Sequence, residues 1–102
     1  MEDDTAQLVS VARAMLAGRL ELIDGVRRIT KLRANMPDPD GAVFDVIRGV
    51  DSETDDLPVG EERALWDSKA LAEKDIVRQE YVEKVRAVVL DACARIVDRF
   101  SE

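Results

Sequence analysis

Apolar residues recur every three or four positions along most of the chain, which is the spacing of one face of an α-helix. This pattern predicts a helix over residues 5–17, ended by Gly18, and a second over residues 20–35. The prolines of segment 36–41 disfavour helical geometry and end the second expected helix. A short helix is expected after this break, over residues 41–48. No segment shows the alternation typical of a β-strand.

The last forty residues predict the longest element, helical from about residue 61 to residue 100 with a break at residues 66–68. About 30 residues would span about 45 Å, more than the diameter of a 100-residue domain. The other helices should therefore pack on this one, or a second copy should cover its end. The expected apolar stripe contains Val77, Tyr81, Val85, Val88, Ala92 and Ile96, widened by Val82, Val89, Cys93, Val97 and Phe100.

These elements predict an all-α fold of four or five helices packed on a long C-terminal helix, in a single domain over residues 1–102. Gly25 lies on the apolar face of the second expected helix, where it would let another helix approach closely. The alternative is a simple helix defect costing about 1 kcal/mol. The opposite surface of this helix is basic and carries Arg27, Arg28, Lys31 and Arg33.

Charge is distributed unevenly along the chain. The net charge is −7, and residues 51–102 contribute most of it, with 14 acidic and 8 basic side chains. An acidic surface repels nucleic acids and anionic membranes and attracts basic proteins, so we expect a basic protein partner. The acidic N-terminus, the single cysteine and the lack of a membrane-length apolar run predict a cytoplasmic protein.

Residue types needed for several kinds of catalysis are missing. The chain has no histidine and one cysteine, which excludes Ser-His-Asp triads, histidine-bound zinc and thiolate metal clusters. Cys93 lies on an apolar helix face and is expected to be an inert core residue. We therefore expect no enzymatic activity and no cofactor.

Six acidic residues without a basic one occupy the stretch from Asp51 to Glu62. Oxygen donors alternate from Asp51, and Glu62 falls twelfth, which is the spacing of an EF-hand calcium loop. However, Asp56 stands where that loop needs glycine, and Pro58 stiffens the return segment. A Mg²⁺ or Ca²⁺ site remains the alternative interpretation of these carboxylates.

We interpret the same stretch first as an ordered connection between helices, with carboxylates left over for a partner. Arg27, Arg28, Lys31 and Arg33 are the expected internal partners of its acids. Trp66 would be either an interface anchor or a core residue beneath the loop. The candidate partner-binding residues are Asp51, Glu53, Asp55, Asp56, Glu61, Glu62 and Trp66.

The segment "GVDSETDDLPVG", followed by Arg63 and Trp66, resembles the centre of a group of small uncharacterised bacterial proteins. In these proteins an Asp-Ser-Glu-Thr-Asp-x-Leu-Pro-x-Gly motif joins helical flanks, and the resemblance covers about residues 9–100. In size, charge and helicity the chain is also similar to bacterial immunity proteins, which bind and block basic toxin domains. The acidic stretch and the missing catalytic residues predict a non-enzymatic interaction module, and the similarity to immunity proteins implies an immunity-type role. The long apolar face of the last expected helix, which exceeds what the short helices can cover, predicts a homodimer.

Overall fold

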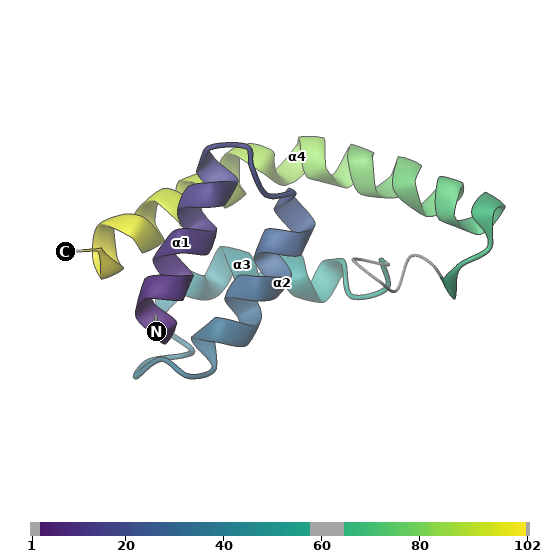
Figure 1. Cartoon of the computed structure of the whole chain (residues 1–102). Coiled ribbons are helices and arrows are strands. Elements are labelled where there is room, and N and C mark those ends of the chain that lie inside the picture. The colour runs from purple at the N-terminus through teal and green to yellow at the C-terminus, as the bar shows by residue number, and fades with distance from the viewer. Residues whose placement is uncertain (1–2, 58–64, 102) are drawn as a thin grey trace.

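The computed structural model describes residues 3–57 and 65–101. All regular elements in this part of the chain are helices, which confirms the predicted fold class (Figure 1). Their order is α1 (Asp4–Leu16), α2 (Leu22–Arg33), the 3-10 turn η1 (Ala42–Phe44), α3 (Asp45–Glu53) and α4 (Ser68–Phe100). The predicted helical start at residues 61–64 lies outside the described residues.

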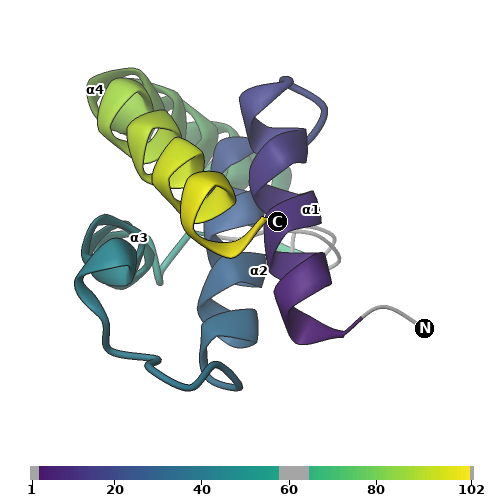
Figure 2. The same ribbon diagram turned by 90° about the vertical axis from the view of Figure 1, so that its left-hand side faces the viewer.

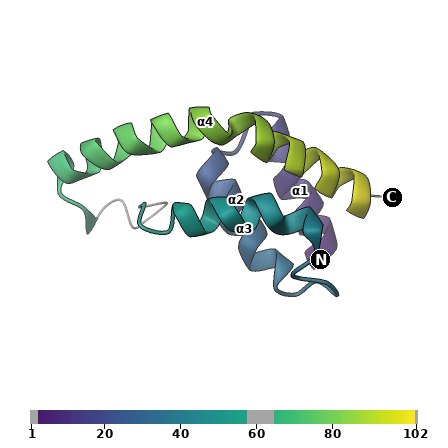
Figure 3. The same ribbon diagram turned by 180° about the vertical axis from the view of Figure 1, so that it is seen from behind.

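The helices form two crossed layers. The α1/α2 pair packs across the α3/α4 pair, as seen by comparing the front view in Figure 1 with the rear view in Figure 3. Viewed end-on in Figure 2, α1, α2, α3 and the C-terminal part of α4 surround one core. The long axis of the molecule measures 45 Å, against 29 and 24 Å for the others, because α4 extends beyond the crossing point.

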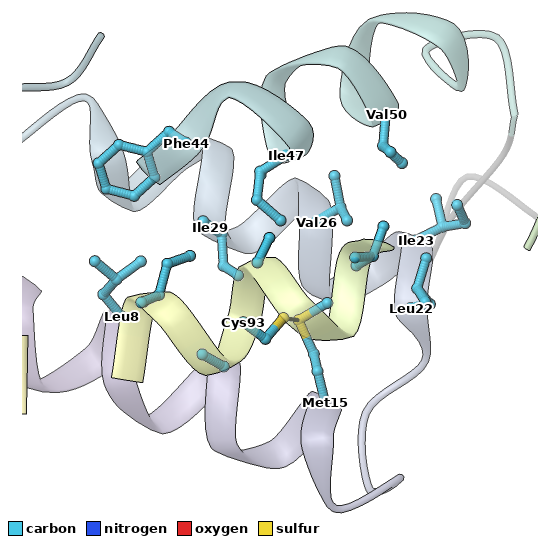
Figure 4. Packing of buried hydrophobic residues seen from close by; sticks show 14 of the residues in the cluster. Leu8, Met15, Leu22, Ile23, Val26, Ile29, Phe44, Ile47, Val50 and Cys93 are labelled. Atoms are coloured by element: carbon cyan, nitrogen blue, oxygen red, sulfur yellow. Dashed lines mark hydrogen bonds between the residues drawn. The ribbon is translucent and has the colours of Figure 1, made fainter. Parts of the chain in front are cut away.

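The core forms where the apolar faces of the four helices meet (Figure 4). Phe44 is fully buried, and its ring lies 5.9 Å from the ring of Phe100 at the end of α4. Aliphatic side chains fill the remainder, so burial of apolar surface stabilises the crossing of the two layers. The fully buried aliphatic residues include Leu8, Ile23, Val26, Ile29, Ile47, Val89 and Ile96.

Gly18 ends α1 as predicted. Its φ of 74° is left-handed, and two hydrogen bonds close the turn: from Gly18 N to Met15 O and from Arg19 N to Ala14 O, at 3.1 and 2.9 Å. This is the Schellman arrangement that glycine favours at helix ends. The chain then reverses direction into α2.

Gly25 acts as the close-approach point that its apolar position predicted. A β-carbon at this position would lie 2.3 Å from the sulfur of Met15, so the α1 side chain occupies the space that a larger residue would need. Met15 Sδ also lies 3.7 Å from Cys93 Sγ of α4. The Met15 side chain of α1 therefore contacts both Gly25 of α2 and Cys93 of α4; Figure 4 shows Met15 beside Cys93.

The helix after the proline segment is longer than the predicted 41–48. α3 continues to Glu53 because Val50 is buried beside Ile47 and because Thr54 closes the last turn. The backbone N–H and the hydroxyl of Thr54 both donate to Val50 O, at 3.1 and 2.7 Å. Asp51 and Glu53 therefore belong to a helix and not to a loop.

α4 begins after Asp67, whose carboxylate accepts from Ala70 N at 3.4 Å. The buried side chains of α4 start only at Val82. Its first half, residues 68–81, extends away from α1 and α2 (Figures 1 and 3); we call it the overhang. Two members of the predicted apolar stripe, Val77 and Val88, are 55% and 53% exposed, so the prediction that they face the core is wrong.

Candidate functional site

The acidic segment, residues 51–57, connects α3 to the part of the chain that leads into α4. It begins in the last turn of α3 and ends at Leu57, which is only 4% exposed. Between them lies Thr54, the one buried polar residue among those described, with 1% of its surface exposed. Two buried residues thus fix the backbone of the segment, and its acidic side chains point outward around them.

Arg27 of α2 binds the backbone of the acidic segment. Its guanidinium donates through Nη2 to the backbone carbonyl of Thr54 and, at 3.1 Å, to that of Leu57. Carbonyls at the C-terminal end of a helix lack intrahelical partners and carry partial negative charge. Arg27 therefore stabilises the end of α3 through the main chain, and it does not use a carboxylate of the segment.

The other three predicted basic partners of the segment lie elsewhere. Arg33 donates to Pro39 O at 2.7 Å and pairs with Asp40 at 3.4 Å, so it orders the proline segment. Arg28 and Lys31 are exposed and form no ion pair within the described part of the chain. Of the four predicted arginine and lysine partners, only Arg27 contacts the acidic segment.

Two of its carboxylates contact α4. The Tyr81 hydroxyl donates to Glu53 at 2.5 Å, and burial together with this bond raises the pKa of Tyr81 to about 12. Lys74 lies 2.8 Å from Asp56, and its hydrogen bond lowers the pKa of the Asp56 carboxyl. Sequence reasoning missed both partners, although Lys74 and Tyr81 share one side of α4 by their seven-residue spacing.

The two remaining carboxylates of the segment have no bonding partner among the described residues. Asp51 is half-buried and Asp55 is exposed, and neither forms an ion pair or side-chain hydrogen bond within residues 3–57 and 65–101. The other two predicted acids, Glu61 and Glu62, lie outside the described residues. The described segment thus presents two free carboxylates beside two that bind α4.

Trp66 and Leu65 follow at the start of the second described range. Trp66 is half-buried and is not a core residue; the ammonium of Lys74 lies 5.9 Å from the centre of its ring. Leu65 is 87% exposed. Trp66 therefore lies outside the core formed by the described residues, and an apolar surface lies close to the lysine that binds Asp56.

A second charged contact joins the N-terminus of α2 to the overhang. Arg78 lies 2.5 Å from Glu21 and 3.5 Å from Asp24, and Glu21 also accepts from Asp24 N at 2.9 Å as the N-cap of α2. Burial would raise the pKa of the Glu21 carboxyl, but the hydrogen bonds from Arg78 and the α2 backbone outweigh it, so the pKa is lowered. These groups line an open groove of about 510 Å³.

The metal interpretation of the acidic stretch stays a prediction. Because α3 runs to Glu53, the first three positions of an EF-hand-type loop starting at Asp51 are helical. Within the described ranges, no three His, Cys, Asp or Glu side chains are grouped closely enough to hold a metal ion.

Cys93 lies in the core, away from these charged contacts. It is fully buried beside Met15, and burial raises the pKa of its thiol to about 11. A nucleophilic cysteine needs its thiolate form, so this thiol is protonated and sterically inaccessible at neutral pH. The predicted core position of Cys93 is confirmed.

Comparison with known proteins places the chain in a family but not in a functional class. The chain belongs to the family described as "Protein of unknown function (DUF2489)", whose family model matches residues 3–96. No curated protein and no solved structure matches it. Among the described residues, no helix combines the length and apolar character needed to cross a membrane.

Proposed function

We propose that this protein is a non-enzymatic interaction module that binds a basic protein partner through the free carboxylates of its acidic segment. Asp51 and Asp55 would form the centre of the binding surface, with Glu53 and Asp56 adding negative charge at its edge. The exposed Leu65 and the half-buried Trp66 would supply apolar contact area beside them. Tryptophan is enriched among the residues that contribute most to binding at protein interfaces.

The observation that carries this proposal is the way Arg27 binds the segment. Had its guanidinium formed salt bridges with the segment, the carboxylates would serve the fold. Instead it donates to the carbonyls of Thr54 and Leu57, so the backbone is fixed while the charges of Asp51 and Asp55 stay available. A surface whose backbone is already ordered loses less conformational entropy on binding.

An immunity-type role is the specific form of this proposal. The chain is small, helical and acidic, with a net charge of −7, and immunity proteins with these properties block basic toxin domains. Long-range attraction between such an acidic protein and a basic partner speeds their encounter. The central Asp-Ser-Glu-Thr-Asp motif would then serve both as the α3 ending and as the recognition surface.

Affinity capture from the native host tests the proposal. Wild-type protein should retain a basic protein, and the purified pair should associate more slowly as salt is added. The variant Asp51→Asn/Asp55→Asn should bind this partner at least about tenfold more weakly, because it loses two charges from the interface centre. The control Asp38→Asn/Asp98→Asn removes two exposed carboxylates elsewhere and should bind like wild type.

Equal binding by the wild type and the Asp51/Asp55 variant would refute the role of the acidic segment. Capture of no basic partner would refute the proposed function. Calorimetric titration of both proteins with Ca²⁺, Mg²⁺ and Mn²⁺ tests the alternative. Metal binding by the wild type that disappears in the Asp51/Asp55 variant would support a metal site.

A further inference from the structure

An open groove with a basic edge lies between α1 and α2. It encloses about 380 Å³, and Val11 and Leu32 line it as half-buried apolar residues, with Ser10 and Gln7 beside them. Arg28 and Lys31 supply its charges, are both exposed, and form no ion pair within the described residues. We call this the α1/α2 groove; it combines an apolar floor with two available cations.

A surface of the opposite charge lies on the overhang of α4. Ile76 and Val77 are 61% and 55% exposed, although both are large apolar residues. Glu73 and Glu80 flank them one turn away on either side, are exposed, and form no ion pair within the described ranges. We call these four residues the α4 strip; it combines two apolar side chains with two available carboxylates.

We propose that the α4 strip of one copy docks into the α1/α2 groove of a second copy. Ile76 and Val77 would cover Val11 and Leu32, and the carboxylates of Glu73 and Glu80 would pair with Arg28 and Lys31. The two surfaces are complementary, because two carboxylates face two cations around an apolar centre. This local attraction would counteract the repulsion between two chains that each carry a net negative charge. A helix lying in a groove between two helices is a common recognition geometry.

The two surfaces belong to different elements, so one chain can use both at once. A pair of copies related by a two-fold axis would form the contact twice, which closes the assembly as a dimer. The overhang projects beyond the crossed helices (Figures 1 and 3), so its outer surface is accessible to a neighbouring molecule. The α4 strip and the α1/α2 groove share no residue with the acidic segment.

Charge reversal tests the contact in its two halves. The variants Arg28→Glu/Lys31→Glu and Glu73→Lys/Glu80→Lys each place like charges across the homotypic contact. Wild type should sediment as a dimer at micromolar concentration, and each variant as a monomer, with a dissociation constant raised at least about tenfold. Mixing the two variants should restore a one-to-one complex, because acidic strip meets basic groove in one contact and basic strip meets acidic groove in the other.

The control Arg13→Glu/Arg19→Glu reverses two exposed cations that do not line the groove, and it should remain dimeric. Circular dichroism establishes that all variants fold. Wild-type protein that is monomeric at high micromolar concentration would overturn the proposal. Variants that dimerise by themselves, or a mixture that stays monomeric, would overturn it equally.

Discussion

The two halves of α4 contact the rest of the protein through different chemistry. From Val82 onward, the inner face of the helix buries apolar side chains, including Val89 and Ile96, against three other helices. Before Val82 no side chain of α4 is fully buried. The overhang contacts the rest of the protein through the polar ends of Lys74, Arg78 and Tyr81, and at its inner end the Tyr81 side chain also packs against the core. One continuous helix therefore has a half held mainly by apolar packing and a half held mainly by polar contacts.

Apolar residues occur on both halves of α4, but those that are buried lie in the second half. Helix continuity requires only backbone hydrogen bonds and a suitable start, which Asp67 provides. Burial requires a neighbouring apolar surface, and the buried apolar side chains of α1, α2 and α3 pack against the second half of α4. The exposed Ile76 and Val77 of the overhang are therefore available for intermolecular contacts.

The two halves should differ most in the stability lost when one isoleucine in each half is replaced by alanine. Ile96→Ala should destabilise the fold by about 2–5 kcal/mol, because Ile96 is fully buried and its loss leaves a cavity. Ile76→Ala should change stability by less than about 0.5 kcal/mol, since Ile76 is already 61% exposed. Urea unfolding at a concentration where both proteins are monomeric measures the difference; equal losses would show that the overhang packs as the core does.

Removing the arginine at the end of α3 should have the next largest effect. Arg27→Met removes the guanidinium donor from the carbonyls of Thr54 and Leu57, of which Thr54 O keeps its hydrogen bond from Leu57 N, and should cost about 1–3 kcal/mol. The adjacent Arg28→Met is the matched control and, at a concentration where both variants are monomeric, should cost less than about 0.5 kcal/mol, because Arg28 is exposed. Similar unfolding midpoints for the two variants would contradict the role assigned to Arg27.

The attachment of the overhang to α2 should depend on pH. The pKa of Glu21 is lowered from its ordinary value of 4.5 in the folded protein, so its stabilising contribution is complete above that value. The contribution is lost as the pH falls through the lower folded-state pKa. Because the Glu21 side chain is 41% exposed, the effect should be about 0–1 kcal/mol.

The contribution of Glu21 is measured as the difference in unfolding free energy between wild type and Glu21→Gln. This difference is determined at neutral pH and again below pH 4.5. The difference should be larger at neutral pH. Glu83→Gln is the control, since Glu83 pairs with Arg86 on the exposed surface of one helix, with side chains 65% and 50% exposed. A pH dependence as large for Glu83 as for Glu21 would rule out a specific contribution from the α2 contact.

The smallest expected effect is at the contact between the overhang and the acidic segment. Asp56 is 63% exposed and Lys74 is 33% exposed, so their pairing is strongly screened by solvent. Lys74→Met should leave the urea midpoint unchanged within error. A clear loss of stability would show that the contacts of Lys74 stabilise the fold more than a solvent-screened ion pair does.

Sequence periodicity predicted the helical fold, the Gly18 stop and the close approach at Gly25, because each follows from local geometry or from one face of one helix. It failed at Val77 and Val88, since the pattern of a single helix cannot show where its neighbours end. It also placed the end of α3 too early, because Thr54 and the distant Arg27 stabilise that end together. The prediction that Arg27 lies beside the acidic segment was correct. The pattern of charged residues could not show, however, that Arg27 binds backbone carbonyls and not carboxylates.

The packing of Met15 on Gly25 has a consequence for how this family can diverge. Any side chain at position 25 needs the space that the Met15 thioether occupies, so a substitution at position 25 requires the residue at position 15 to move or to be replaced. Relatives with alanine at position 25 should carry a smaller residue at position 15, or a displaced first helix. Such paired exchange across an alignment would record the α1–α2 contact as covariation between two sites ten residues apart.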